Sequence, residues 1–212
     1  MNTQNKPDAF QNLLTFEQIV ETLTNTIDSK HVHHVALAGV DSRSGTHDIC
    51  ASLVKTLALS HSRVLLVTVE NDGKTALSSL PGMDKRFEQV IKSAQDHKEG
   101  GIITTEIYTQ ELPHPASPQE ARLQNIMKAL EDVYDVIVWD LPPTDKAVQS
   151  RMVAQFTQGV VLVVEAGKTR WQSAHHAMEH FKYSGAQILG IILNNKKNYI
   201  PDWLYRLLFR DI

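Results

Sequence analysis

Short apolar runs alternate along the chain with segments whose apolar residues recur every three or four positions. Runs without polar alternation are typical of strands that are buried on both faces of a parallel sheet. They predict six strands, at residues 31–39, 63–69, 102–107, 134–143, 160–167 and 186–194. All of these runs are far shorter than the roughly 20 apolar residues that cross a bilayer as a helix.

The segments between these runs have helical periodicity. Helices are predicted over Leu13–Ile27, Ala147–Phe156 and Arg170–Tyr183, and around the apolar stripes at 49–58, 87–94 and 123–130. Ser117 is predicted to cap the helix that contains the last of these stripes, with Pro118 in its first turn and Glu120 at the capping-box position.

Strands that alternate with helices predict an α/β fold, a doubly wound and mainly parallel sheet flanked by helices. The length of 212 residues and the hydrophobic content of 42% predict a single domain over 1–212, with a polar lead-in at 1–12 and an amphipathic tail at 196–212. Ligands of such sheets bind at the carboxyl ends of the strands, so the residues that follow each strand are the candidates for function.

The charge and cysteine content narrow the class of protein. The net charge is -3 and the charged fraction is 21%, which does not indicate a nucleic-acid partner. The single cysteine, Cys50, cannot form an internal disulfide and lies among apolar positions, so we expect it to pack in a core in a reducing compartment. The lead-in does not have the pattern of a secretory signal, and we therefore expect a cytoplasmic protein.

Gly39 to His47, GVDSRSGTH, lies between a predicted strand and a predicted helix, as a phosphate-binding loop does. The general pattern is G-x-x-x-x-G-K-[ST], in which the lysine neutralises phosphate and the hydroxyl binds magnesium. This loop has one residue more between its glycines, Thr46 in place of the lysine and His47 in place of the hydroxyl residue. Asp41 adds negative charge and Arg43 is the only cation of the loop. The loop is either structural or binds nucleotide without turning it over.

Asp140 ends the predicted strand YDVIVWDLPP, where the Walker-B aspartate of a nucleotide hydrolase stands. Two interpretations are open from the sequence. The carboxylate is a magnesium ligand if the site is active, or it caps the turn formed with Pro142 and Pro143.

Four segments resemble one family of proteins, namely RVLLVTVEND, YDVIVWDLPP, GVVLVVEAGKTRWQSAHHAMEHFKYSGAQILGIILNN and YIPDWLYRLL. They look like the bacterial tyrosine kinases (BY-kinases) of capsule and exopolysaccharide synthesis, within the MinD/ParA group of deviant-Walker ATPases. The resemblance runs from about Phe16 to Leu208 and implies a P-loop NTPase-like fold. Its most specific motifs are Asp-x-Pro-Pro, Ala-Gly-x-Thr and the Leu-Asn that closes the last strand.

The resemblance assigns roles to a few positions only. It implies that Asp140 is the metal ligand and that Asn194 contacts the base of ATP or ADP, with magnesium as the accompanying ion. The implied remnant of the nucleotide site comprises Arg43, Ser44, Gly45, Thr46, His47 and Asn194. The second acidic motif of the family falls on Thr68 and Glu70, so its first aspartate is replaced and its second is a glutamate.

Other departures lie near the ends of the chain. Val20 and Leu23 stand where the family has the arginines of its oligomerisation motif, which leaves a homo-oligomer open. The tail carries only Tyr199 and Tyr205 in place of a tyrosine cluster. Its apolar stripe around Trp203 predicts a short helix, which packs on the sheet or docks on a partner or a membrane. The histidine pairs at 33–34 and 175–176 lack the spacing of a metal site and are expected at the surface or the core edge.

Together these observations favour a degenerate BY-kinase-like pseudo-ATPase over an active enzyme. The resemblance implies a role in exopolysaccharide assembly or export. The implied partner is a Wzz-type chain-length membrane protein, which would hold the chain at the inner membrane, or an active kinase paralogue. The alternatives are an active tyrosine autokinase or ATPase that uses Arg43 or His47 as a substitute phosphate ligand, and a MinD- or ParA-like positioning factor.

Overall fold

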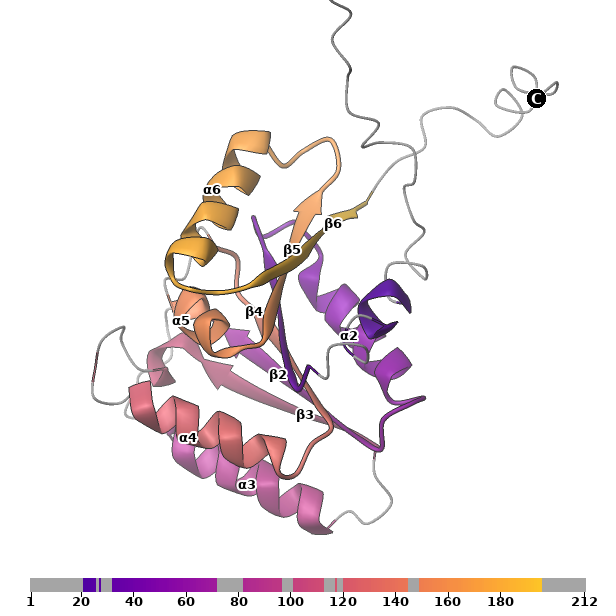
Figure 1. The fold of residues 1–212 in the computed structure, drawn as a ribbon, viewed down its shortest axis with the longest axis vertical. Helices are drawn as coiled ribbons and strands as arrows, with labels where there is room; N and C mark the ends of the chain where they lie inside the picture. The colour runs from indigo at the N-terminus through magenta and orange to yellow at the C-terminus, as the bar shows by residue number, and fades with distance from the viewer. Residues whose placement is uncertain are drawn as a thin grey trace, which may run out of the picture.

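We describe residues 21–25, 27, 32–71, 82–96, 101–112, 117, 120–144 and 149–195 of a computed structural model (Figure 1). Six parallel strands form one sheet in the order β3-β2-β4-β1-β5-β6. Their bounds are β1 His34–Gly39, β2 Arg63–Glu70, β3 Gly101–Tyr108, β4 Val136–Leu141, β5 Gly159–Glu165 and β6 Ile188–Asn194. The predicted doubly wound α/β sheet is therefore confirmed.

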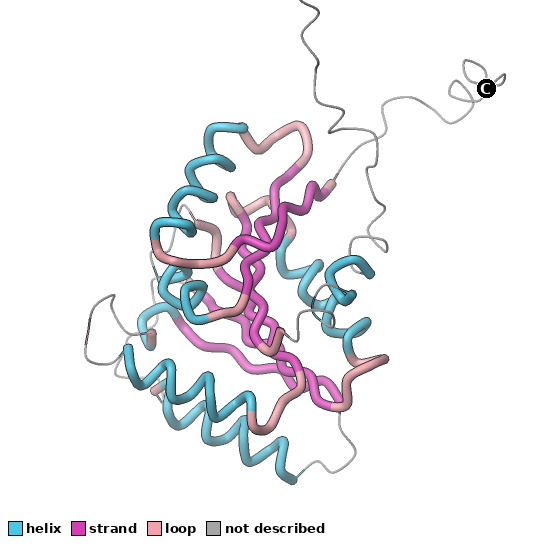
Figure 2. Tube along the Cα trace, viewed as in Figure 1, coloured by secondary structure: helices cyan, strands magenta, loops and turns pink. Residues whose placement is uncertain are grey.

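Helices cover both faces of this sheet (Figure 2). Their bounds are α2 Thr46–Leu57, α3 Met83–Asp96, α4 Glu120–Glu131, α5 Gln149–Phe156 and α6 Trp171–Tyr183, with a short 3-10 turn, η2, at Thr109–Glu111. Of the helix predicted over 13–27, residues 21–25 and 27 are described and are helical. The lead-in at 1–12 and the tail at 196–212, with the predictions made for them, lie outside the described residues.

Two apolar layers hold the helices to the sheet. One layer lies under α2, where Ile49, Leu53 and Leu57 are fully buried against β1, β2, β4 and β5. Cys50 belongs to this layer and is 0% exposed, which confirms its packing role. The other layer joins α3, α4, α5 and α6 to the opposite face through side chains such as Phe87 of α3. The hydrophobic periodicity of the sequence thus corresponds to burial on these two faces.

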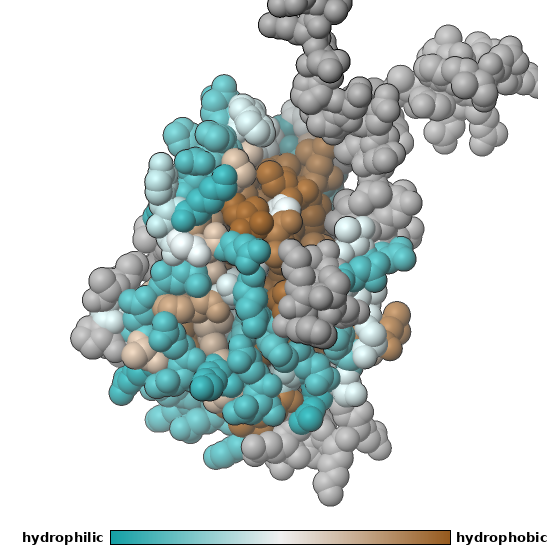
Figure 3. All heavy atoms as spheres, viewed as in Figure 1, coloured by the Kyte–Doolittle hydropathy of each residue, from teal (hydrophilic) through white to brown (hydrophobic). Residues whose placement is uncertain are grey.

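Both edge strands of the sheet, β3 and β6, are partly exposed, and on β6 the exposed residues are apolar. Ile191 is 48% exposed and Leu193 is 36% exposed. Figure 3 shows hydrophobic residues gathered on this side of the molecule, over β5 and β6. No helix in the described part of the chain is both long enough and apolar enough to cross a membrane.

Two local predictions are wrong. The hydroxyl of Ser117 has no hydrogen-bond partner among the described residues, so it does not cap the helix, and the Glu120 carboxylate accepts a hydrogen bond from Gln155 at 2.6 Å. The carboxylate that would cap the helix in a capping box is thereby hydrogen-bonded to Gln155 of α5. His34 is not at the surface or core edge but is 1% exposed, because its ring packs against Trp139 and is hydrogen-bonded on both nitrogens.

Candidate functional site

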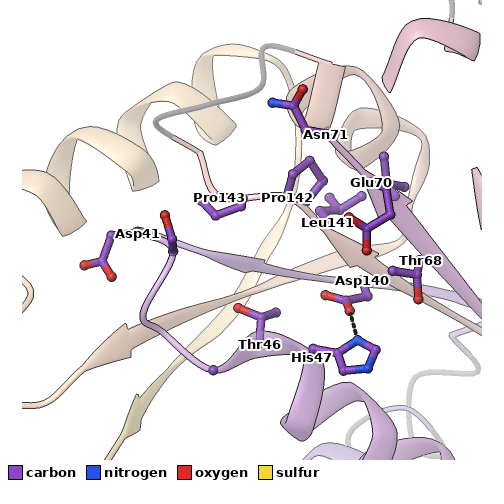
Figure 4. Close-up of a pocket in the computed structure, with 13 residues that line it drawn as sticks. Asp41, Thr46, His47, Thr68, Glu70, Asn71, Asp140, Leu141, Pro142 and Pro143 are labelled. Carbon is purple, nitrogen blue, oxygen red and sulfur yellow. Dashed lines mark hydrogen bonds and ion pairs between the residues drawn. The ribbon is translucent and has the colours of Figure 1, made fainter. Parts of the chain in front are cut away.

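A cavity of about 330 Å³ opens at the carboxyl ends of β1, β2 and β4, beside the first turn of α2 (Figure 4). This is the position at which parallel α/β sheets bind their ligands. Its walls are Asp41, Ser42, Gly45, Thr46, His47, Thr68, Val69, Glu70, Asn71, Asp140, Leu141, Pro142 and Pro143. The structure thus brings the two acidic motifs and the loop of the sequence analysis into one place.

The loop between β1 and α2 is held by a left-handed glycine. Gly45 precedes α2 with φ of +70°, a conformation that glycine adopts at no steric cost. The side-chain amide of Asn194, at the end of β6, donates to the carbonyl oxygen of Ser44 at 2.9 Å. Space at this point is small, since a Cβ on Gly45 would lie 2.6 Å from that amide nitrogen. Asn194 therefore lies against the loop backbone, and its contact to a nucleotide base stays a prediction.

Asp140 and His47 form the closest polar contact in the cavity (Figure 4). Nδ1 of His47 donates to Oδ2 of Asp140 at 2.8 Å. The Asp140 side chain is 8% exposed and the His47 side chain is 68% exposed. Because the imidazole stays in contact with water, the ion pair contributes about 1 kcal/mol or less to folding. Of the two sequence interpretations of Asp140, turn cap or metal ligand, neither describes this contact.

The two groups shift each other's protonation. Burial raises the pKa of Asp140, and the hydrogen bond from His47 opposes this rise. The hydrogen bond to Asp140 raises the pKa of His47 against the opposing effect of desolvation. Beneath them, burial and the nearby Asp140 charge raise the pKa of the Cys50 thiol, so this sulfur stays protonated. The charged form of the histidine is thereby favoured next to the carboxylate.

Arg43 does not line the cavity. Its Nε lies 3.9 Å from Oδ1 of Asp41 and 3.9 Å from Oε2 of Glu165. Asp41 in turn accepts hydrogen bonds from the Arg43 backbone N–H at 3.0 Å and from the Thr169 hydroxyl at 2.9 Å. The only cation of the loop is thus paired with carboxylates of the protein. None of these contacts supports the predicted role of Arg43 as a phosphate ligand.

The residues present do not fit a magnesium ion. A P-loop magnesium is bound by a Ser or Thr hydroxyl at the start of the helix and is associated with the Walker-B carboxylate. Here the position of the hydroxyl carries His47, whose Nδ1–H occupies an oxygen of Asp140. The hydroxyl of Thr46, one residue earlier, lies close to Gly39, since a Cβ on Gly39 would stand 2.8 Å from its Oγ1. No group of three or more His, Cys, Asp or Glu side chains that could hold a metal ion occurs within the described ranges.

Comparison with known proteins agrees with this architecture. The chain is 29% identical over 183 residues to the tyrosine-protein kinase CpsD of Streptococcus agalactiae, a match that covers 80% of this chain and 78% of that protein. A second relative, the tyrosine-protein kinase YwqD of Bacillus subtilis, is 26% identical over 72% of this chain and 68% of its own length. The chain is a homologue of bacterial tyrosine kinases. No protein-family model matches it.

Among solved structures, the kinase domain of the Escherichia coli tyrosine kinase ETK superposes with a TM-score of 0.67 at 18% identity. The match covers 88% of this chain and 76% of that one. At this identity it shows a shared fold and no more. The P-loop NTPase-like fold that the resemblance implied is therefore confirmed.

The sequence analysis missed two residues that position the loop. Thr169 reaches Asp41 from the turn after β5, and the hydroxyl of Thr169 also accepts the backbone N–H of Glu165 at 2.9 Å. Glu165 is 5% exposed, and its Oε1 accepts a hydrogen bond from Lys168 at 2.5 Å. The signal for Thr169 was present, because it is the threonine of the Ala-Gly-x-Thr motif. A buried glutamate at a strand end gives no comparable signal in a sequence.

Proposed function

We propose that this chain is a catalytically inactive relative of the bacterial tyrosine kinases and serves as a partner protein in exopolysaccharide assembly or export. The proposal rests on the charge of the cavity. Three carboxylates, those of Asp41, Glu70 and Asp140, line it, and no lysine or arginine is among its described lining residues. The one basic side chain among them, His47, is hydrogen-bonded to Asp140. Like charges about 4 Å apart repel by roughly 4 kcal/mol at an effective dielectric constant of about 20. A nucleotide phosphate therefore meets repulsion where an active site supplies attraction.

Loss of the lysine supports the same proposal. Catalysis of phosphoryl transfer consists almost entirely of positioning and of stabilising charge that develops in the transition state. Thr46, at the lysine position, has no charge, and Arg43 is paired with Asp41 and Glu165. An active site that used Arg43 in place of the lysine would first have to break these ion pairs. ATP or ADP with magnesium is accordingly not a working cofactor of the proposed function.

The proposed partner is the one that resemblance to the bacterial tyrosine kinases implies. We infer that the chain acts beside a Wzz-type chain-length membrane protein or an active kinase paralogue, at the cytoplasmic face of the inner membrane. The described surface offers β6 as one place for such contact, because its apolar side chains Ile191 and Leu193 are partly exposed. Co-purification of the tagged chain with a Wzz-type chain-length protein tests this part, and Ile191→Lys is expected to weaken the interaction if β6 takes part.

Calorimetry of the purified chain with ATP, with and without magnesium, tests the loss of catalysis. The expected result is no saturable heat, no phosphate release and no phosphotyrosine. The double variant Thr46→Lys/His47→Thr is the positive control, because it restores the lysine and the hydroxyl of the P-loop pattern. Micromolar binding by the wild-type chain together with turnover that Asp140→Ala abolishes would show instead that the chain is an active enzyme.

A further inference from the structure

His47 stands at the second residue of α2, where its ring reaches across to the end of β4. The two elements are adjacent throughout, since α2 packs on the central part of the sheet beside β1 and β4. The 2.8 Å distance from Nδ1 to Oδ2 of Asp140 is that of a charge-assisted hydrogen bond. Figure 4 shows the ring directly against this carboxylate at one wall of the cavity.

This contact occupies Oδ2, one of the two oxygens with which Asp140 could bind a divalent cation. A cation and the Nδ1–H group cannot both lie at hydrogen-bond or coordination distance on the same side of Oδ2. The Nδ1–H donor is present in the charged ring and in the corresponding neutral tautomer. The obstruction therefore depends on the place of the ring and does not depend on its charge.

The other oxygen groups of the cavity remain suited to a hard cation. Glu70 and Thr68 at the end of β2 face the same cavity as Asp140. Carboxylate and hydroxyl oxygens are the ligands that magnesium and manganese prefer. His47 offers ring nitrogens in place of a hydroxyl oxygen, and its Nδ1 is hydrogen-bonded to Asp140.

We propose that the side chain of His47 takes the place of a divalent cation at Asp140, and that exchange of this one side chain for a hydroxyl residue opens a cation site in the cavity. The proposed exchange acts on the binding of the metal ion. It concerns the same cavity as the proposed function but does not depend on the missing lysine, which acts on phosphate.

Titration with Mn²⁺, followed by the electron paramagnetic resonance signal of the free ion, tests this proposal. Wild-type protein is expected to leave the signal unchanged. His47→Thr is expected to bind one Mn²⁺ at least tenfold more tightly than the wild type, and His47→Ser gives the same test with a smaller side chain. His47→Thr/Asp140→Asn is expected to return to the wild-type level, because it lacks the carboxylate. His176→Thr, at an exposed histidine of α6, is the matched control and should gain nothing.

The wild-type chain gives a second, independent reading through its histidine ring signals in nuclear magnetic resonance. The His47 resonances are expected to stay sharp when Mn²⁺ is added, and broadening of these signals alone would refute the proposal. It is also refuted if His47→Thr, with an unchanged circular dichroism spectrum, gains no binding. Tight Mn²⁺ binding by the wild type without ATP turnover would overturn this inference and leave the proposed function intact, whereas ATP turnover would overturn the proposed function.

Discussion

His34 at the start of β1 makes the stability of the fold depend on pH. Its ring is buried and hydrogen-bonded on both nitrogens: Nδ1 accepts from Nε1–H of Trp139 at 3.0 Å, and Nε2 donates to the Met127 carbonyl at 3.1 Å. This arrangement requires the neutral ring with its proton on Nε2. A second proton on Nδ1 would remove the acceptor of the Trp139 indole and leave a charge in the core.

The size of the effect follows from the pKa. Burial lowers the pKa of His34 from 6.5 to about 4, the Met127 carbonyl opposes the change, and the neighbouring His33 adds to it. Because the folded-state pKa lies below the unfolded one, the unfolded chain binds the proton first. The contribution is complete above pH 6.5 and is lost as the pH falls toward 4. At about 1.4 kcal/mol per pKa unit it amounts to about 3 kcal/mol.

Urea unfolding at a series of pH values between neutral and about 4 tests this reasoning. Wild-type protein is expected to lose about 3 kcal/mol across this range beyond the loss from its carboxylates. His34→Gln is the matched control, since its amide can accept from Trp139 and donate to Met127 but does not titrate. The difference between the two proteins in the pH dependence of the unfolding free energy gives the contribution of His34. Equal pH slopes for both would refute the argument, as would stabilisation of the wild type at low pH by an ion pair of His34 with Glu131, whose Oε1 lies 3.5 Å from Nε2.

Two pairs of glycine variants test the packing of the strands and of the loop. A Cβ on Gly159 would lie 2.3 Å from Cγ of Leu189, whereas one on Gly190 would meet nothing within 4 Å. Gly159→Ala is therefore expected to lower the free energy of unfolding by about 1–3 kcal/mol and Gly190→Ala to change it by less than about 0.5 kcal/mol. Gly45 and Gly167 have nearly the same φ, +70° and +71°, but only Gly45 has a side chain within 4 Å. Both alanine variants should lower the free energy of unfolding by about 1–2 kcal/mol because of their backbone conformation, and Gly45→Ala should lower it by about 1 kcal/mol more. Equal losses for the two variants in urea unfolding would contradict the close approach of Asn194 to Gly45.

The sequence predicts the four inner strands of the sheet well because they are buried on both faces. A strand such as β4 needs apolar residues at every position, and such a run is visible without knowledge of its neighbours. The order of the strands is not visible in this way, since it depends on pairing between distant segments. His34 shows the same limit at one residue. A histidine in an apolar run gives no sign that the indole of Trp139 will donate a hydrogen bond to it inside the core.

The candidate site was predicted in its position and only partly in its contacts. Strand ends and the Gly-rich loop place Asp140 and the loop at one edge of the sheet, which general rules of α/β folds suffice to predict. The hydrogen bond between His47 and Asp140 joins residues 93 positions apart and depends on how far the ring reaches from α2. The capping box at Ser117 also depended on a distant residue, because Gln155 of α5 donates a hydrogen bond to the carboxylate of Glu120.

The contacts of the loop also explain how it keeps its shape without contacts to a phosphate. In an active P-loop the backbone N–H groups and the lysine surround the ligand. In this chain the loop is tied at Ser44 by Asn194 and at Asp41 by Thr169, and its arginine is paired with Asp41 and Glu165. These ties come from the ends of β5 and β6, so the fold itself orders the loop. A surface that depends on the loop can then be presented to a partner protein at all times, whether or not a nucleotide is present in the cell.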